Sequence, residues 1–124
     1  MAEILIIDDD PDMRRFIRVT LEQSGHRVTE ASNGAEGLTF WHQQTPDLVI
    51  TDMMMPEKEG LATIMELMRE SPETRVMAIS GATGKTGEQF LQMAQRFGAI
   101  RTLSKPFTPD DLIWAVTDCI NRPR

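Results

Sequence analysis

Acidic, hydroxyl and basic side chains stand at the points where the apolar runs of this chain end. Asp8 and Asp9 follow the first run directly, and Asp52 closes another. Ser80 ends a further run, and Lys105 follows the last one. If these runs are neighbouring parallel strands, their ends lie at the same edge of one sheet. The sequence therefore predicts that three carboxylates, one hydroxyl and one ammonium group lie close together.

Three clustered carboxylates repel one another, by about 4 kcal/mol per pair at roughly 4 Å and an effective dielectric constant of about 20. Such a cluster persists when a divalent cation and a lysine offset the negative charge. Carboxylates, Mg²⁺, a hydroxyl group and a lysine are the components of a site that handles a phosphoryl group. This pattern predicts chemistry on phosphate.

Composition limits the kinds of protein that this chain can be. Its 124 residues, 40% of them hydrophobic, suit one compact domain that extends over residues 1–124. A net charge of −6 argues against nucleic-acid binding by the domain itself. One cysteine, Cys119, precludes an internal disulfide and favours a reducing cytoplasm. No secretory signal and no apolar run long enough to span a bilayer is apparent, so we expect no membrane contact.

Strand and helix patterns alternate along the chain. We expect strands at residues 4–7, 26–31, 48–52, 75–80 and 100–103. Helical patterns follow Asp10 and Asp12, which we interpret as capping residues, and later Gly34. A further helix carries an apolar stripe of Leu61, Ile64, Met65 and Met68. Residues 81–87 are expected to form a loop or an irregular helix start, and the next helix carries a stripe of Phe90, Leu91, Ala94 and Phe97. The last helix begins at Pro109, with Thr108 as its N-cap. Strict alternation of five strands and five helices predicts an α/β fold: a doubly wound parallel sheet with helices on both faces.

Four motifs in this order resemble those of response-regulator receiver domains, the CheY-like superfamily, over essentially the whole chain. They are Asp8-Asp9, Asp52 with Met55-Pro56 and Gly60, Ser80, and Lys105-Pro106-Phe107. Each motif alone is weak, but four at successive strand ends are specific. The resemblance implies a five-stranded sheet in the order 2-1-3-4-5 with the site at its carboxyl edge.

The same resemblance implies a role for each residue of the cluster. Asp52 is expected to be the nucleophile that becomes an acyl phosphate, with a phosphohistidine of a kinase or phosphotransfer protein as donor. Asp9, Asp52 and the backbone carbonyl of Met54 are expected to hold Mg²⁺, and Asp8 to act through a bound water. Lys105 and Ser80 are expected to contact the phosphoryl oxygens, and Pro106 to follow a cis peptide bond.

The sequence also departs from the family pattern where receivers transmit their signal. The position three residues before Lys105 is often Tyr or Phe in the family, and here it is Thr102. Ile113 and Trp114 begin the last helix and are a candidate contact patch with Thr102. The implied function is a phosphorylation-dependent signalling switch and not an enzyme, with output through a downstream protein, an attached domain or a second copy of the chain.

Two enzyme classes are alternatives. Asp8 and Asp10 have the D-x-D spacing of haloacid-dehalogenase-type phosphatases. The motif of that family also requires Thr or Val two residues after Asp10, where this chain has Asp12. Gly84-Lys85-Thr86 follows a strand, as in a phosphate-binding loop. The full motif also requires glycine at position 79, and the residue there is Ile79. Both alternatives are therefore disfavoured.

Overall fold

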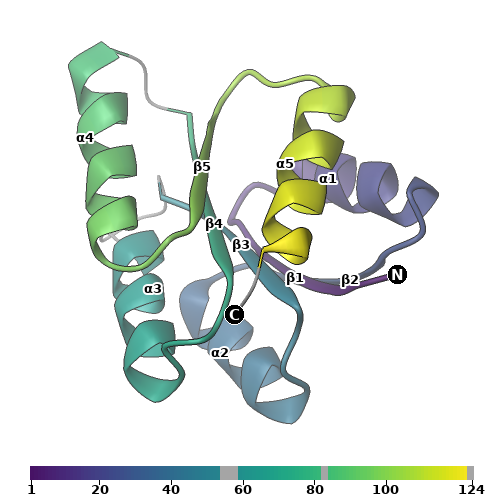
Figure 1. Cartoon of the computed structure of the whole chain (residues 1–124), viewed down its shortest axis with the longest axis horizontal. Coiled ribbons are helices and arrows are strands. Elements are labelled where there is room, and N and C mark those ends of the chain that lie inside the picture. The colour runs from purple at the N-terminus through teal and green to yellow at the C-terminus, as the bar shows by residue number, and fades with distance from the viewer. Residues whose placement is uncertain (54–58, 82–83, 123–124) are drawn as a thin grey trace.

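The computed structural model describes residues 1–53, 59–81 and 84–122, in which strands and helices alternate (Figure 1). The strands are β1 (Glu3–Ile7), β2 (Arg27–Ala31), β3 (Leu48–Asp52), β4 (Val76–Ser80) and β5 (Arg101–Ser104). The helices are α1 (Pro11–Gln23), α2 (Gly34–Gln43), α3 (Glu59–Glu70), α4 (Gly84–Arg96) and α5 (Pro109–Asn121).

The five strands form one parallel sheet in the order β2-β1-β3-β4-β5, which confirms the predicted fold class. β1 lies between β2 and β3, so the chain reverses its direction of travel across the sheet after β2. Ligands bind to open α/β sheets at such a reversal, beyond the carboxyl ends of the strands. The topology thus predicts the place of the site before any side chain is considered.

Helices cover both faces of the sheet, α1 and α5 on one side and α2, α3 and α4 on the other (Figure 1). Alternate residues of β1 serve the two cores: Ile4 and Ile6 pack toward α1 and α5, while Leu5 and Ile7 pack toward α2 and α3. Every one of these four side chains is almost fully buried. Burial on both faces explains why the strand reads as a continuous apolar run.

Side chains fix the starts of three helices. Asp10 caps α1 by accepting a hydrogen bond from the backbone N–H of Asp12 at 2.9 Å. Asn33 caps α2, and Thr108 caps α5 in a capping box with Asp111. The predicted capping role of Asp10 is confirmed, whereas that of Asp12 is wrong. Asp12 is the donor of this bond and lies in the first turn of α1.

The predictions about α3 and α4 are confirmed only in part. The segment 81–87, predicted to be a loop or an irregular helix start, contains the first residue of α4, Gly84, so the second alternative is confirmed. The two predicted apolar stripes each include a residue that the structure exposes: the exposed fractions are 47% for Met65 and 41% for Phe97. Phe97 also lies one residue beyond the end of α4. Leu67, which was not in the predicted stripe of α3, is buried instead.

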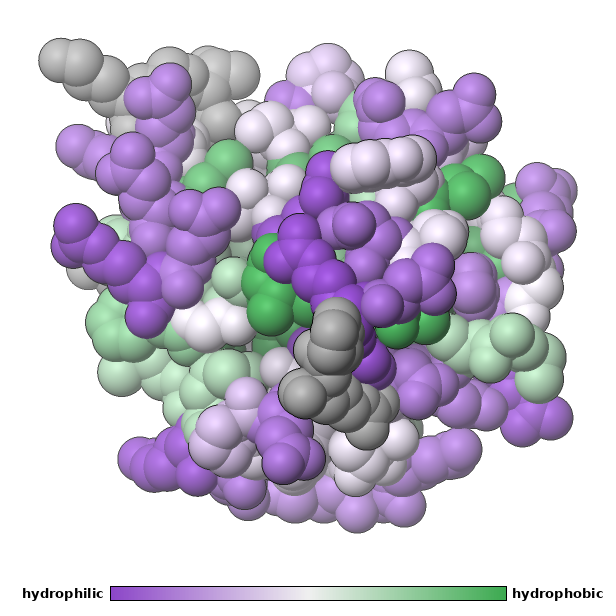
Figure 2. Space-filling model, viewed as in Figure 1, coloured by the Kyte–Doolittle hydropathy of each residue, from purple (hydrophilic) through white to green (hydrophobic). Residues whose placement is uncertain are grey.

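Hydrophilic residues predominate on the face shown in Figure 2, where hydrophobic residues form separate small patches. Within the described parts of the chain, no helix combines the length and the apolar character that crossing a bilayer requires.

The thiol of Cys119 lies inside the core on α5 and is fully buried. Burial raises its pKa to about 11, and the thiolate is the reactive form. At pH 8 the thiol is therefore protonated, and its burial keeps it out of reach of a reagent. We therefore expect 5,5′-dithiobis(2-nitrobenzoic acid) to label the folded protein far more slowly than the protein in guanidinium chloride. Equal labelling rates in the two states would show that Cys119 is accessible.

Candidate phosphoacceptor site

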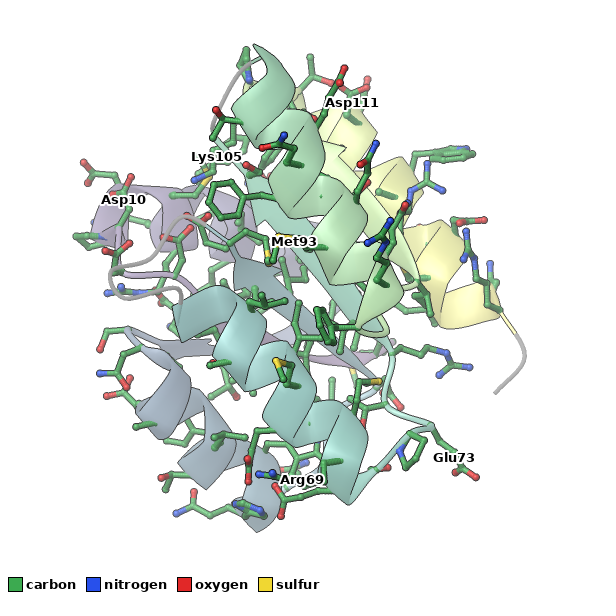
Figure 3. All side chains as sticks on the ribbon, turned by 90° about the vertical axis from the view of Figure 1, so that its left-hand side faces the viewer. Asp10, Arg69, Glu73, Met93, Lys105 and Asp111 are labelled. Carbon is green, nitrogen blue, oxygen red and sulfur yellow. The ribbon has the colours of Figure 1, made fainter. Side chains whose placement is uncertain are left out.

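The carboxyl edge of the sheet brings together the acidic residues that the sequence singled out. Asp8 follows β1 and Asp52 is the last residue of β3, and these strands are neighbours. One carboxylate oxygen from each of Asp8, Asp9 and Asp52 lies within 4.8 Å of the other two. Lys105, which follows β5, lies at this same end of the molecule as Asp10 (Figure 3). The three predicted carboxylates therefore lie close together at this edge of the sheet.

Lys105 contacts the carboxylates directly. Its Nζ lies 3.0 Å from Oδ2 of Asp52 and 3.8 Å from Oδ2 of Asp8. Asp52 is only 4% exposed, and the Lys105 side chain is 20% exposed. Lys105 is thus a partly buried counter-charge, which is more effective than a fully solvated one. The Lys105–Pro106 peptide bond is cis, as the resemblance implied.

Lys105 reaches Asp52 across the end of an intervening strand. β5 pairs with β4, and only β4 pairs with β3, so the lysine side chain crosses the carboxyl end of β4. Gly81 follows β4 at that point. A Cβ atom at position 81 would lie 3.2 Å from Cδ of Lys105, which is a tight contact. The absence of a side chain at Gly81 therefore leaves room for the lysine, a role that the sequence alone did not reveal.

Asp8 is almost fully buried and is held by hydrogen bonds to β2 and to its own loop. Its backbone N–H donates to the carbonyl of Ala31 at 3.1 Å, and its Oδ1 accepts from the backbone N–H of Asp10 at 2.9 Å. Burial raises the pKa of the Asp8 carboxyl to about 6, although the Asp10 hydrogen bond works in the opposite direction. The nearby Asp52 charge adds to the increase in this pKa, and Lys105 opposes it.

The arrangement fits a hard divalent cation. Asp8 Oδ2 is buried, and no described residue gives it a hydrogen bond. Asp9 is exposed and so leaves the cluster open to solvent on one side. An all-oxygen donor set that is open to water suits Mg²⁺, which keeps several water ligands. Met54, whose carbonyl was predicted as a further ligand, lies outside the described residues.

Ser80 ends β4 beside this cluster. The residue is fully buried, and its carbonyl accepts a hydrogen bond from the backbone N–H of Lys105 at 2.9 Å. This bond joins the end of β4 to the start of the loop that carries the lysine. The predicted contact of the Ser80 hydroxyl with a phosphoryl group remains a prediction.

Gly60 in the first turn of α3 lies against the end of β3. A Cβ atom at this position would be 2.2 Å from the carbonyl oxygen of Asp52 and 2.9 Å from Cα of Met53. Both atoms belong to the backbone, so they can move aside only if the end of β3 moves with them. Only glycine thus allows α3 to pack closely behind Asp52. The sequence pattern contained this glycine, but the close approach that explains it becomes visible only in three dimensions.

The residues of the two enzyme alternatives have structural roles. Asp10 caps α1 through its carboxylate, which accepts the hydrogen bond from Asp12. Ile79 lies in β4 and is 1% exposed, and α4 begins at Gly84. Position 79 is therefore part of a buried strand and does not contribute to a glycine-rich loop.

The predicted output residues lie on β5 and α5. Thr102 and Ile113 are partly buried, so Ile113 is less exposed than the predicted contact patch required. Trp114 is 60% exposed. The guanidinium of Arg101 lies over the Trp114 ring, 4.3 Å from its centroid, and also donates to Asp118 at 2.9 Å. The Trp114 side chain is therefore held on one face by Arg101 and open to solvent elsewhere.

Comparison with known proteins agrees with this geometry. The family model of the response regulator receiver domain matches residues 4–117. Protein PilH of Pseudomonas aeruginosa is 34% identical over 113 residues, which are 91% of this chain and 93% of that protein. A probable transcriptional regulator, ycf27, of Guillardia theta is 33% identical over 89% of this chain. The chain spans only 42% of the length of that regulator.

A solved structure shows the same fold. The crystal structure of a response regulator receiver domain protein from Clostridium thermocellum superimposes with a TM-score of 0.85 and 35% sequence identity. The match covers 98% of this chain and 96% of that one. The chain belongs to the response regulator receiver domain family. It is thus a receiver domain of two-component signalling, and the acidic cluster lies where the fold places a ligand.

Proposed function

We propose that this receiver domain is a phosphoacceptor switch in which Asp52 takes a phosphoryl group from a phosphohistidine. The observation that carries the proposal is the position of Lys105 Nζ, 3.0 Å from Asp52 within a cluster of three carboxylates. The donor is a histidine kinase or a histidine phosphotransfer protein. Both proteins must share a compartment, and the proposed compartment is the cytoplasm. The acting unit is proposed to be one domain, residues 1–124.

The chemistry is a transfer between two nucleophiles. A carboxylate oxygen of Asp52 forms a bond to phosphorus while the bond between phosphorus and the imidazole nitrogen of the donor breaks. The nitrogen keeps the electron pair and, once protonated, leaves a neutral histidine. Lys105 stabilises the negative charge on the phosphoryl oxygens, and Ser80 donates a hydrogen bond to one of them.

Mg²⁺ is the proposed cofactor, and when bound it would supply positive charge that reduces the repulsion between the cluster and the incoming phosphoryl group. Asp9 and Asp52 would hold it directly, with the carbonyl of Met54, and Asp8 would act through a bound water.

We expect Mg²⁺ to bind in the micromolar-to-millimolar range and Asp9→Ala to weaken binding by about tenfold or more, because a ligand and its charge are lost. Isothermal titration calorimetry with Asp12→Ala as control measures this. Asp12 is an acidic residue in the first turn of α1, close to Asp9 in the sequence but outside the cluster of Asp8, Asp9 and Asp52. An unchanged affinity in Asp9→Ala would refute the ligand role.

Lys105 is proposed to matter more for the response than for the transfer itself. We expect Lys105→Ala still to gain a phosphoryl group, since Mg²⁺ neutralises part of the incoming charge. The amide signals around Thr102 should then no longer shift on phosphorylation, because Lys105 is the link from the site to β5. Two-dimensional ¹H–¹⁵N NMR tests this, with Arg27→Ala at the opposite end of the sheet as control. Full shifts in Lys105→Ala would place the coupling elsewhere.

The proposed output is docking of a downstream protein, an output domain or a second copy of the chain on β5 and α5. Trp114, Ile113 and Thr102 lie there, and aromatic side chains often anchor such contacts. No role in nucleic-acid binding is proposed for the domain itself, in keeping with its net charge of −6.

Acetyl phosphate provides a direct test of the proposed function. The protein is incubated with acetyl phosphate and Mg²⁺, and its intact mass is measured. A stoichiometric adduct that is lost at alkaline pH, as acyl phosphates are, supports the switch. Sustained hydrolysis of phosphate esters by Asp8 and Asp10, without an adduct on Asp52, would instead support the dehalogenase-type alternative.

A further inference from the structure

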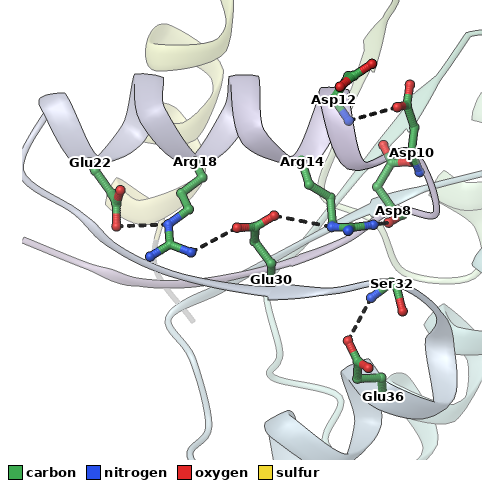
Figure 4. A network of polar contacts seen from close by, with 9 residues as sticks. All are labelled: Asp8, Asp10, Asp12, Arg14, Arg18, Glu22, Glu30, Ser32 and Glu36. Atoms are coloured by element: carbon green, nitrogen blue, oxygen red, sulfur yellow. Dashed lines mark hydrogen bonds and ion pairs between the residues drawn. The ribbon is translucent and has the colours of Figure 1, made fainter.

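An ion-pair chain on α1 and β2 ends at the backbone of the acidic cluster (Figure 4). Glu22 accepts from Arg18 at 3.2 Å, Arg18 donates to Glu30 at 2.9 Å, and Glu30 accepts from Arg14 at 3.2 Å. Arg14 then donates through Nη1 to the carbonyl oxygen of Asp8 at 2.6 Å. The chain thus reaches the peptide group that joins Asp8 to Asp9.

The last link is better shielded from water than the first. The Arg14 side chain is 16% exposed and that of Glu30 is 26% exposed, against 44% for Arg18 and 43% for Glu22. Hydrogen bonds from Arg18 and Arg14 hold the pKa of Glu30 below its usual range, so Glu30 remains a carboxylate. A charged partner of fixed orientation on β2 therefore holds the guanidinium of Arg14 in place.

With Arg14 in place, Asp8 is held at three points. Its N–H is bonded to Ala31, its carboxylate to the N–H of Asp10, and its carbonyl to Arg14. Among the described residues, none donates a hydrogen bond to the Asp9 carboxylate, so the position of that side chain depends on the backbone before it. Rotation of the 8–9 peptide group would move Asp9 relative to Asp52.

We infer that Arg14 is a positioning residue for the acidic cluster: by holding the Asp8 carbonyl, it orients the peptide group that places the Asp9 carboxylate toward the cation. Arg14 does not act as a ligand or as a counter-charge to the phosphoryl group, because its charge is already paired with Glu30. The inference rests on the proposed Mg²⁺ site for its consequence, and on the hydrogen bonds alone for the orientation of the loop.

An effect of charge and an effect of positioning would change the Mg²⁺ affinity of an Arg14 variant in opposite directions, so one measurement distinguishes them. Removal of a cation near a cation site strengthens Mg²⁺ binding if only charge matters. Loss of orientation weakens it, and the loss of groups that orient metal ligands typically costs tenfold or more in affinity. We expect Arg14→Met to raise the Kd for Mg²⁺ about tenfold in calorimetry. The matched control is Arg18→Met. It removes one positive charge from the same helix and one ion pair with Glu30, but it leaves the hydrogen bond to the Asp8 carbonyl in place. It should stay within about twofold of the original protein or bind more tightly.

A metal-free measurement separates failure of this inference from failure of the proposed site. In ¹H–¹⁵N spectra without Mg²⁺, the Asp9 amide signal should shift or broaden in Arg14→Met and stay in place in Arg18→Met. Urea unfolding of both variants identifies a general loss of stability, and Arg14→Lys, which keeps the charge but not the forked donor, is the second variant. An unmoved Asp9 signal in Arg14→Met, or equal effects of both arginine variants, would overturn the inference. Absence of Mg²⁺ binding in the unaltered protein, with the Asp9 signal shifted in Arg14→Met, would overturn the metal site and leave the positioning role supported.

Discussion

Asp52→Asn is expected to abolish the phosphoryl adduct that acetyl phosphate forms on the unaltered protein. The amide is nearly the same size as the carboxylate, so the fold should persist, but the amide oxygen lacks the negative charge of the nucleophile. The ion pair with Lys105 at 3.0 Å is lost as well. Intact-mass spectrometry after incubation with acetyl phosphate and Mg²⁺ measures the effect.

Asp12→Asn is the control for this experiment. Asp12 is an acid in the first turn of α1, outside the group of three carboxylates. The Asp12→Asn variant should acquire the adduct as fully as the unaltered protein. A full adduct on Asp52→Asn would show that another residue is the acceptor, and peptide mapping would then identify it.

Gly60→Ala is expected to have the second large effect, this time on stability. The new Cβ would meet the Asp52 carbonyl oxygen at 2.2 Å, and relief requires that α3 or the end of β3 move. Overpacking of this kind typically costs about 1–3 kcal/mol, and contact with backbone atoms places Gly60→Ala at the upper end. Because the strained atoms belong to Asp52 and Met53, the adduct with acetyl phosphate should form more slowly too. Urea unfolding and mass spectrometry measure the two effects.

Gly25→Ala separates these two consequences. Gly25 has φ of +93° and no atom within 4 Å of the added Cβ. Alanine at this φ costs about 1–2 kcal/mol in backbone strain. Position 25 lies in the turn that follows α1, far from the site. The Gly25→Ala variant should lower the free energy of unfolding and leave phosphorylation unchanged. If Gly60→Ala were as stable and as reactive as the unaltered protein, the close approach of α3 to β3 would be refuted.

The sequence predicted the strand ends well because parallel strands covered on both faces are continuous apolar runs. Ile4–Ile7 and Leu48–Asp52 are such runs, and the polar residue that ends each of them is easy to recognise. Once the strands are parallel neighbours, geometry brings Asp8, Asp52 and Lys105 together. The acidic cluster and its lysine were therefore accessible to reasoning from sequence.

Helix ends and helix faces were less predictable. The glycine-rich segment 81–87 is compatible with a loop or with a helix start, and the structure shows that Gly84 begins the helix and that Gly87 is buried within it. Local preference against glycine is weak compared with the burial of the apolar side of a helix. Periodicity likewise cannot show how wide the covered face is. Met65 and Phe97 fit the helical spacing, but both side chains lie outside the face that packs on the core and are exposed.

Contacts between side chains and distant backbone leave no signal in a single sequence. The bond from Arg14 to the Asp8 carbonyl depends on where β2 places Glu30, and the space left by Gly81 depends on the path of Lys105 over β4. Both are products of the assembled sheet. They refine the site that the strand ends define.

The two tryptophans give the domain separate optical reporters. Trp41 of α2 is 8% exposed and belongs to the core, whereas Trp114 of α5 is 60% exposed and stacked against Arg101. Acrylamide should quench the emission of Trp114 and spare that of Trp41. A Trp41→Phe variant would then isolate the signal from α5, so that a partner binding at this surface could be followed by fluorescence without any attached dye.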